Sequence, residues 1–212
     1  DRIYKKIISK QVCSNVYDYC LSQSKISNLF FDEDSSYKNV LRTGNIIFSS
    51  NKKKNHNKNK FILYAVTQKP TNCDQLLGCE LYFEFIDNLR FLSKLAQTTK
   101  YKFIVKLHPV EKNNITKLKL LFNNLIFSND HIDLLIQKVD ILTSFSSTVI
   151  EDSINSYTPV ILLDRYKRYR HCKAETNVTI KNKAIYYVTN SNDYINAIKT
   201  INSSHNINFD EY

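Results

Sequence analysis

The stretch VDILTSFSSTVIEDSINSYTPVILLD, residues 139–164, decides the fold that we predict for this chain. A short apolar run at 139–142 is followed by a polar hinge at 143–148, then by a helix-like segment and a second apolar run at 159–163. Strand, hinge, helix and strand in this order are typical of a βαβ unit. The hinge lies where the first strand ends and the helix begins, which is the edge at which open α/β sheets bind ligands.

The hydroxyl side chains of this hinge have two interpretations. Ser and Thr are preferred helix N-caps, and Thr148 with Glu151 forms an S/T-x-x-E capping box that would hold the helix end without a ligand. Hydroxyls beside the free N–H groups of a helix start also favour an anion, usually a phosphate. This stretch by itself does not separate the two interpretations.

The alternation of strand-like and helix-like segments continues outside this unit. Apolar runs predict strands, and apolar residues at three- and four-residue spacing predict helices. The further predicted strands are 61–66, 103–107, 125–127 and 184–188, and the further predicted helices are 77–96, 113–122, 130–138 and 193–201. Strands that alternate with helices predict a doubly wound, mainly parallel, Rossmann-like α/β sheet covered on both faces.

The amino-terminal part departs from this regular pattern. Residues 11–22 fit a helix and residues 39–48 are strand-like around Gly44. Residues 49–60, SSNKKKNHNKNK, contain no apolar side chain and are typical of a basic linker or exposed loop. We therefore predict a domain boundary at residues 49–60, which separates residues 1–48 from one regular α/β domain at residues 61–212.

Composition excludes several classes of protein. The chain has 212 residues, of which 42% are hydrophobic, so it can bury a core, but no apolar run approaches the length of a membrane span. Its formal net charge is +10, yet no RNP, zinc-finger or basic-zipper pattern occurs, so we do not expect nucleic acid as a partner. Only two glycines are present, which excludes a G-x-G-x-x-G dinucleotide loop and a P-loop.

The cysteines and acidic residues predict no metal site and no cofactor. Five cysteines form no C-x-x-C pair, which indicates reduced thiols in a cytoplasmic protein. Asp32-Glu33-Asp34 resembles a metal-binding DxD, but it lies in a polar stretch outside the regular part and is interpreted as solvated surface. The chain starts at Asp1 without a visible signal peptide, so we expect that start to be a fragment boundary.

Polar residues follow several predicted strands. Thr67-Gln68-Lys69 follows the strand at 61–66, His108-Pro109 ends the strand at 103–107, and Asp164-Arg165 ends the strand at 159–163. The carboxyl ends of parallel strands share one edge of a sheet, so these residues are expected to converge with the hinge.

At this point the chain resembles the C-terminal half of GT-B-fold glycosyltransferases. The resemblance rests on His108-Pro109, Ser146-Ser147 and Pro159-Val160-Ile161, and it covers roughly residues 61–163. The most similar groups are bacterial surface-polysaccharide enzymes: capsule transferases, sialyltransferases and polysialyltransferases with HP and SS motifs, and CDP-glycerol glycerophosphotransferases. The segment Leu41-Arg42-Thr43-Gly44-Asn45 resembles the exit from the N-terminal domain of such enzymes. The resemblance implies that residues 1–48 are the tail of an N-terminal, acceptor-side domain and that residues 61–212 form the nucleotide-sugar-binding domain.

The resemblance implies roles for particular residues. His108 would be catalytic, contacting the donor phosphate or supporting departure of the leaving group, because a protonated imidazole can stabilise charge there without a metal. Ser146 and Ser147 would bind that phosphate. Glu151 would reach the ribose hydroxyls.

Four further residues at the same edge complete the predicted site. Thr148 and Lys69 are predicted to bind the donor phosphate with the serines. The basic loop 165–173 has two interpretations: Arg165 and Arg168 contact an anion, or the loop is solvated and mobile, which we favour.

These residues imply a set of ligands and leave two alternatives open. The donor would be a CMP-, CDP- or UDP-linked sugar, and the acceptor a saccharide or lipid-linked molecule. Either acceptor is compatible with peripheral association of the protein at the inner membrane. The acidic-acidic-Gly motif of the sialyltransferases is missing, since Ser35 follows Glu33-Asp34, so the catalytic base is expected outside these residues. The alternatives are a UDP-GlcNAc 2-epimerase-like isomerase and a non-catalytic polyanion-binding or assembly module.

Overall fold

A computed structural model describes residues 20–22, 40–42, 60–67, 78–109, 111 and 115–210. The chain divides into two compact units, Asp1–Asn51 with Tyr212, and Lys52–Glu211. In the first unit, β1 (Cys20–Ser22) pairs in parallel with β2 (Val40–Arg42), with Leu21 beside Leu41. The helix predicted at 11–22 is therefore wrong over its last three residues, because strand pairing there overrides the local helical pattern. The assignment of residues 1–48 to an acceptor-side domain stays a prediction.

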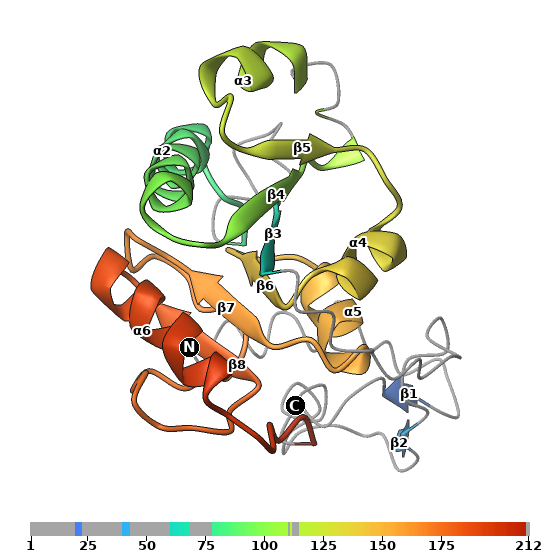
Figure 1. The fold of residues 1–212 in the computed structure, drawn as a ribbon. Helices are drawn as coiled ribbons and strands as arrows, with labels where there is room; N and C mark the ends of the chain where they lie inside the picture. Colours follow the sequence, from blue (N-terminus) through green and yellow to red (C-terminus); the bar gives the residue numbers. More distant parts are fainter. Residues whose placement is uncertain are drawn as a thin grey trace. The chain divides into compact units, whose positions relative to one another are not determined.

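The second unit is built on a six-stranded parallel sheet (Figure 1). Its strands are β3 (Phe61–Ala65), β4 (Lys102–Lys106), β5 (Ile126–Ser128), β6 (Ile141–Ser144), β7 (Val160–Leu163) and β8 (Ile185–Val188). The helices described between and after them are α2 (Tyr82–Thr98), α3 (Ile115–Leu121), α4 (Ile132–Lys138), α5 (Val149–Asn155) and α6 (Ser191–Asn202). The order across the sheet is β5-β4-β3-β6-β7-β8, and every neighbouring pair is parallel. The predicted doubly wound Rossmann-like α/β fold is confirmed.

Helices cover both faces of this sheet. Alternate residues of β3 point to opposite faces of the sheet. Ile62 and Tyr64 belong to the core under α2, α3 and α6. Leu63, between them, points to the other face, which α4 and α5 cover. Figure 1 shows α2 and α6 on the side of the sheet opposite to α4 and α5. Since β3 and β6 are the central strands, both of their faces are buried, and the sequence of β3 is an unbroken apolar run.

Two predicted boundaries are wrong in ways that affect the site. The strand β6 continues through Thr143 and Ser144, both fully buried, so the hinge between β6 and α5 contains only residues 145–148. The helix predicted at 77–96 begins instead at Tyr82. Its start is fixed by the side chain of Glu84, whose Oε2 accepts a hydrogen bond of 2.7 Å from the Leu81 N–H.

Candidate functional site

The candidate site lies at the switch point of the sheet, where the carboxyl ends of β3 and β6 are neighbours. From β3 the chain proceeds to β4 and β5 on one side, and from β6 to β7 and β8 on the other. Crossovers that leave in opposite directions open a crevice at this point, and doubly wound proteins bind ligands there. The hinge 145–148 follows β6 at this edge, as the sequence predicted.

Thr67, at the end of β3, holds the hinge in place. Its hydroxyl donates a hydrogen bond to the Ser146 carbonyl and accepts one of 3.3 Å from the Ser146 N–H. Just before the hinge, the Ser144 hydroxyl donates to the Ala65 carbonyl at 2.8 Å. The backbone of the hinge is therefore tied to the neighbouring strand through residues 79 positions apart in the sequence.

The three hydroxyl residues of the hinge differ in their surroundings. Ser146 is only 7% exposed, and its Oγ lies 2.9 Å from Nδ1 of His171. Ser147 is half-buried, and its Oγ accepts a 3.3 Å hydrogen bond from the Val149 N–H. Thr148 is exposed and is the N-cap of α5.

The predicted capping box of Thr148 and Glu151 is wrong. The Thr148 side chain makes no capping hydrogen bond, because Thr148 has helical backbone angles (φ −60°, ψ −19°) rather than the extended ones of a side-chain cap. Ser147 supplies the side-chain acceptor instead. The helix α5 has only seven residues, so its N-terminus by itself is not an anion site. An anion at this hinge would be bound by the hydroxyl side chains.

The other residues predicted for the site lie at different distances from the hinge. His108 follows β4 and is half-buried, and β3 lies between β4 and β6, so the strand ends that carry His108 and the hinge are not neighbours. Two strand spacings separate those ends, about 10 Å in a sheet. Glu151 is exposed on α5, and partial desolvation raises its pKa. Lys69 lies outside the described residues.

The basic loop after β7 is packed against the protein at Arg168, Tyr169 and His171, whereas Arg165 and Arg170 are exposed, so the favoured interpretation of a solvated loop holds only for part of it. The guanidinium of Arg168 lies 5.0 Å from the centroid of the Phe145 ring, and the Tyr169 ring lies 5.9 Å from the same ring. With the contact between His171 and Ser146, these interactions attach the loop to the hinge.

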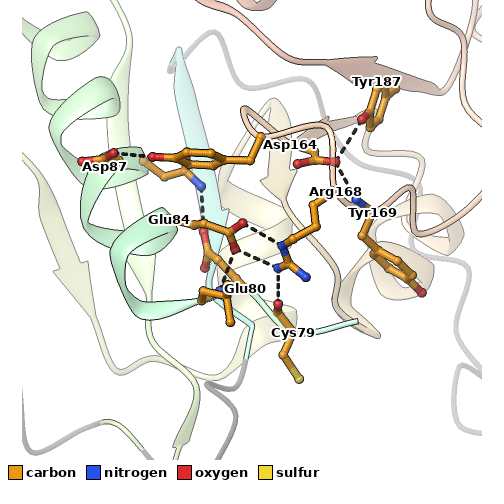
Figure 2. A network of polar contacts seen from close by, with 11 residues as sticks. Cys79, Glu80, Glu84, Asp87, Asp164, Arg168, Tyr169 and Tyr187 are labelled. Carbon is orange, nitrogen blue, oxygen red and sulfur yellow. Dashed lines mark hydrogen bonds and ion pairs between the residues drawn. The ribbon is translucent and has the colours of Figure 1, made fainter. Parts of the chain in front are cut away.

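A bidentate ion pair fixes the loop to the start of α2 (Figure 2). Nε and Nη2 of Arg168 each donate a hydrogen bond of 2.8 Å to the carboxylate of Glu84, which is 2% exposed, and Nη2 also donates to the Cys79 carbonyl at 2.5 Å. Glu84 raises the pKa of Arg168 in return. Arg165 is exposed and donates to the Asp87 carbonyl at 3.1 Å. The roles of Arg165 and Arg168 as anion contacts stay predictions, and Arg168 has Glu84 as its partner here.

Asp164, at the end of β7, shapes the turn that starts this loop (Figure 2). Its Oδ2 accepts hydrogen bonds from the Tyr169 N–H at 2.8 Å and from the Tyr187 hydroxyl at 2.9 Å. Burial and the neighbouring carboxylate of Asp164 raise the pKa of Tyr187 to about 12. A buried carboxylate with two donors holds the loop in one conformation.

The carboxyl group of Asp152, in α5, is expected to destabilise the fold at neutral pH. Desolvation, aided by the charges of Asp133 and Glu151 and opposed by His131, raises its pKa to about 6. Its folded-state pKa is thus above the unfolded value, so its contribution to the free energy of unfolding falls between about pH 4 and pH 6 and then stays constant. We expect Asp152→Asn to stabilise the protein by roughly 1 kcal/mol at neutral pH, after allowance for solvent screening. Urea unfolding across this pH range, with Asp210→Asn as control, measures the effect; a gain that is independent of pH would contradict it.

The described residues contain neither a metal-binding cluster nor a membrane-spanning helix. In the described ranges, no cluster of three or more His, Cys, Asp or Glu side chains is arranged to hold a metal ion, and Asp32-Glu33-Asp34 lies outside those ranges. Within the same ranges, no helix has the length and apolar character needed to cross a membrane. Cys79 and Cys172 carry free thiols, and burial raises the pKa of Cys172 to about 12.

The strand order and the hinge define a doubly wound α/β protein whose ligand-binding edge lies at the switch point. No family model and no curated protein matches the sequence. Among solved structures, the crystal structure of TarM shares the fold, with a TM-score of 0.52 and 15% identity over 100% of this chain. A mutant of S. aureus TarM in complex with fondaparinux, α-GlcNAc-glycerol and UDP gives a TM-score of 0.53 at 15% identity over 96% of this chain.

In both comparisons this chain spans only 40% of the TarM chain. A variant of the wall teichoic acid polymerase TagF gives a TM-score of 0.41 at 18% identity, covering 76% of this chain and 42% of that one, which is too low to show a shared fold. The similarity to TarM therefore establishes a shared fold over the part of the TarM chain that this chain covers.

Sequence reasoning placed Thr67 and Asp164 at this edge without giving them a role, and it missed the roles of Glu84 and His171. Thr67 and His171 contact the hinge, and Asp164 and Glu84 fix the loop that carries His171. The position of Thr67 and Asp164 at strand ends was visible in the sequence. The Glu84–Arg168 and Ser146–His171 pairs had no local signal, because their members belong to different elements.

Proposed function

We propose that this chain supplies the donor-binding half of a GT-B-fold glycosyltransferase, or glycerophosphotransferase, that acts in bacterial surface-polysaccharide synthesis with a nucleotide-activated donor. One observation carries the proposal: a hinge with two adjacent serine hydroxyls lies at the switch point of a parallel sheet and is held to β3 by Thr67. The fold shared with TarM supports it.

The hinge suits a phosphate because it offers short, fixed hydroxyl donors. Ser146 and Ser147 would donate to oxygens of the donor phosphate, with the exposed Thr148 hydroxyl and Lys69 as further contacts. Ser146 and Ser147 belong to a hinge that Thr67 holds before the ligand arrives, so they need little reorganisation as charge develops. Glu151, exposed one turn into α5, would accept hydrogen bonds from ribose hydroxyls, and Arg165 at the rim would contact the anion.

In the proposed reaction, the bond between the transferred group and the phosphate oxygen breaks, and its electron pair passes to that oxygen. The acceptor hydroxyl forms the new bond and loses its proton to a base outside the described residues. His108, at the end of β4, would stabilise the leaving phosphate or give it a proton, which makes the transfer independent of a metal ion. The distance of two strands between His108 and the hinge fits a ligand that spans the edge.

The partners follow from the same chemistry. The donor is proposed to be linked to CMP, CDP or UDP, and the acceptor to be a saccharide or a lipid-linked molecule reached from the cytoplasm, at the periphery of the inner membrane. A TarM complex that holds UDP and α-GlcNAc-glycerol supports a nucleotide donor and a saccharide acceptor.

Calorimetric titration with CMP, CDP and UDP tests the proposal. We expect one of the three to bind, and Ser147→Ala to weaken that binding by about tenfold, because a hydrogen bond to a charged group is lost. His108→Ala should have an effect of similar size, while Ser204→Ala, which alters a hydroxyl beyond the end of α6, should have none. Absence of binding by the wild-type chain, or equal binding by Ser147→Ala, contradicts the proposal. Equal, salt-sensitive binding of unrelated polyanions would favour a non-catalytic module.

A further inference from the structure

We propose that His171 is a positioning residue for Ser146: its Nδ1–H donates to the Ser146 Oγ and so directs the Ser146 hydroxyl proton to the phosphate of the bound nucleotide. The inference rests on the proposed function and assigns a role that neither the sequence nor the comparisons assign. Its basis is the contact of 2.9 Å between Ser146 Oγ and His171 Nδ1 at the switch-point edge.

A serine hydroxyl has one proton to donate and two lone pairs that accept. If the Ser146 hydroxyl donates to Nδ1, it offers only lone pairs to an anion, and the contact is repulsive. If Nδ1 carries the proton, the Ser146 oxygen accepts from it and its own proton is free for a phosphate oxygen. A phosphate bound at Ser146 therefore selects the form of His171 with a proton on Nδ1.

The surroundings of both side chains support a fixed geometry. Ser146 is 7% exposed, and both its N–H and its carbonyl are hydrogen-bonded to the Thr67 hydroxyl. These bonds fix the backbone position from which the Ser146 side chain extends. His171 is half-buried beside the Tyr169 ring, with the ring centroids 6.2 Å apart. Desolvation lowers the pKa of His171, which favours a neutral imidazole that can act as a directional donor.

The loop that carries His171 is itself held at two points. Asp164 accepts from the Tyr169 N–H two positions before His171, and Arg168 is paired with Glu84 on α2. These contacts place the imidazole against the hinge before any ligand is present. A residue that only filled space would need no such alignment of Nδ1 with a hydroxyl.

A double-mutant cycle on UDP binding tests this role in the full chain at neutral pH. We expect Ser146→Ala and His171→Leu each to weaken UDP binding by about tenfold, and the double variant to weaken it by the same factor rather than by their product, because His171 acts through Ser146. His171→Asn, which keeps an N–H near the position of Nδ1, should recover most of the affinity. His205→Leu, an exposed histidine beyond α6, is the matched control.

A spectroscopic readout separates positioning from a structural role. In ¹⁵N-detected imidazole spectra of the wild-type chain saturated with UDP, we expect the Nδ1 of His171 to carry the proton. Wild-type affinity in His171→Leu, multiplicative losses in the double variant, or an unprotonated Nδ1 in the complex would each contradict the role of His171. None of these three results would affect the proposed function. Failure of the wild-type chain to bind any of UDP, CDP and CMP would contradict both the proposed function and this inference.

Discussion

Arg168→Ala is expected to lower the free energy of unfolding by about 3 kcal/mol, because it leaves the buried carboxylate of Glu84 without its ionic partner. Glu84 is 2% exposed, and after the substitution it keeps the Leu81 N–H as a donor but loses two charge-assisted hydrogen bonds from Arg168. The Cys79 carbonyl loses its contact as well. Urea-induced unfolding at neutral pH measures the loss.

The control for this prediction is an exposed ion pair between an arginine and an aspartate on α2, the helix that contains Glu84. Arg90 lies 3.0 Å from Asp87, but the two side chains are 69% and 35% exposed, so Arg90→Ala should change stability by no more than about 0.5 kcal/mol. Replacing the buried pair together, as Arg168→Met with Glu84→Leu, should recover part of the loss because no unpaired charge remains. Equal unfolding midpoints for Arg168→Ala and Arg90→Ala would show that the pair does not hold the loop.

Leu142→Ala is expected to lower the free energy of unfolding by about 2–5 kcal/mol, through lost transfer energy and the cavity left behind. Leu142 is fully buried in β6, a central strand with β3 on one side and β7 on the other, so the neighbouring side chains cannot collapse easily into the space. Thermal or urea unfolding of the variant measures this change.

The matched control is an apolar residue of the edge strand. Ile126, in β5, is 44% exposed, and Ile126→Ala should cost less than about 1 kcal/mol. A comparable loss at both positions would contradict the strand order, because that order is what places β6 at the centre and β5 at the edge.

Local patterns predicted most of the sheet. The strands β3, β4 and β7 were found within one or two residues, because strands buried on both faces appear as short runs of apolar residues bounded by turns. The largest errors in boundary have identifiable causes. α2 starts at Tyr82 because the Glu84 side chain binds the Leu81 N–H, and β6 includes Thr143 and Ser144 because their hydroxyls have buried partners, the Tyr194 hydroxyl and the Ala65 carbonyl.

The site was predicted in outline but not in composition. The hinge with Ser146 and Ser147 was located at the correct edge, since the carboxyl ends of parallel strands must share an edge. The histidine beside it was not, because His108 was selected by its motif, whereas His171 reaches Ser146 through a loop that sequence reasoning treated as solvated. The aromatic rings in that loop were a usable signal, because Tyr169 packs on Phe145.

The sequence by itself determined the alternation of strands and helices, the parallel sheet and the placement of the hydroxyl hinge at a strand end, because these depend on spacing between neighbours in the chain. The tertiary structure alone decided that β3 separates β4 from β6, that Arg168 pairs with Glu84 across 84 positions, and that His171 meets Ser146. Hydrogen bonds and ion pairs between distant residues depend on how the elements pack, and no local periodicity records that packing.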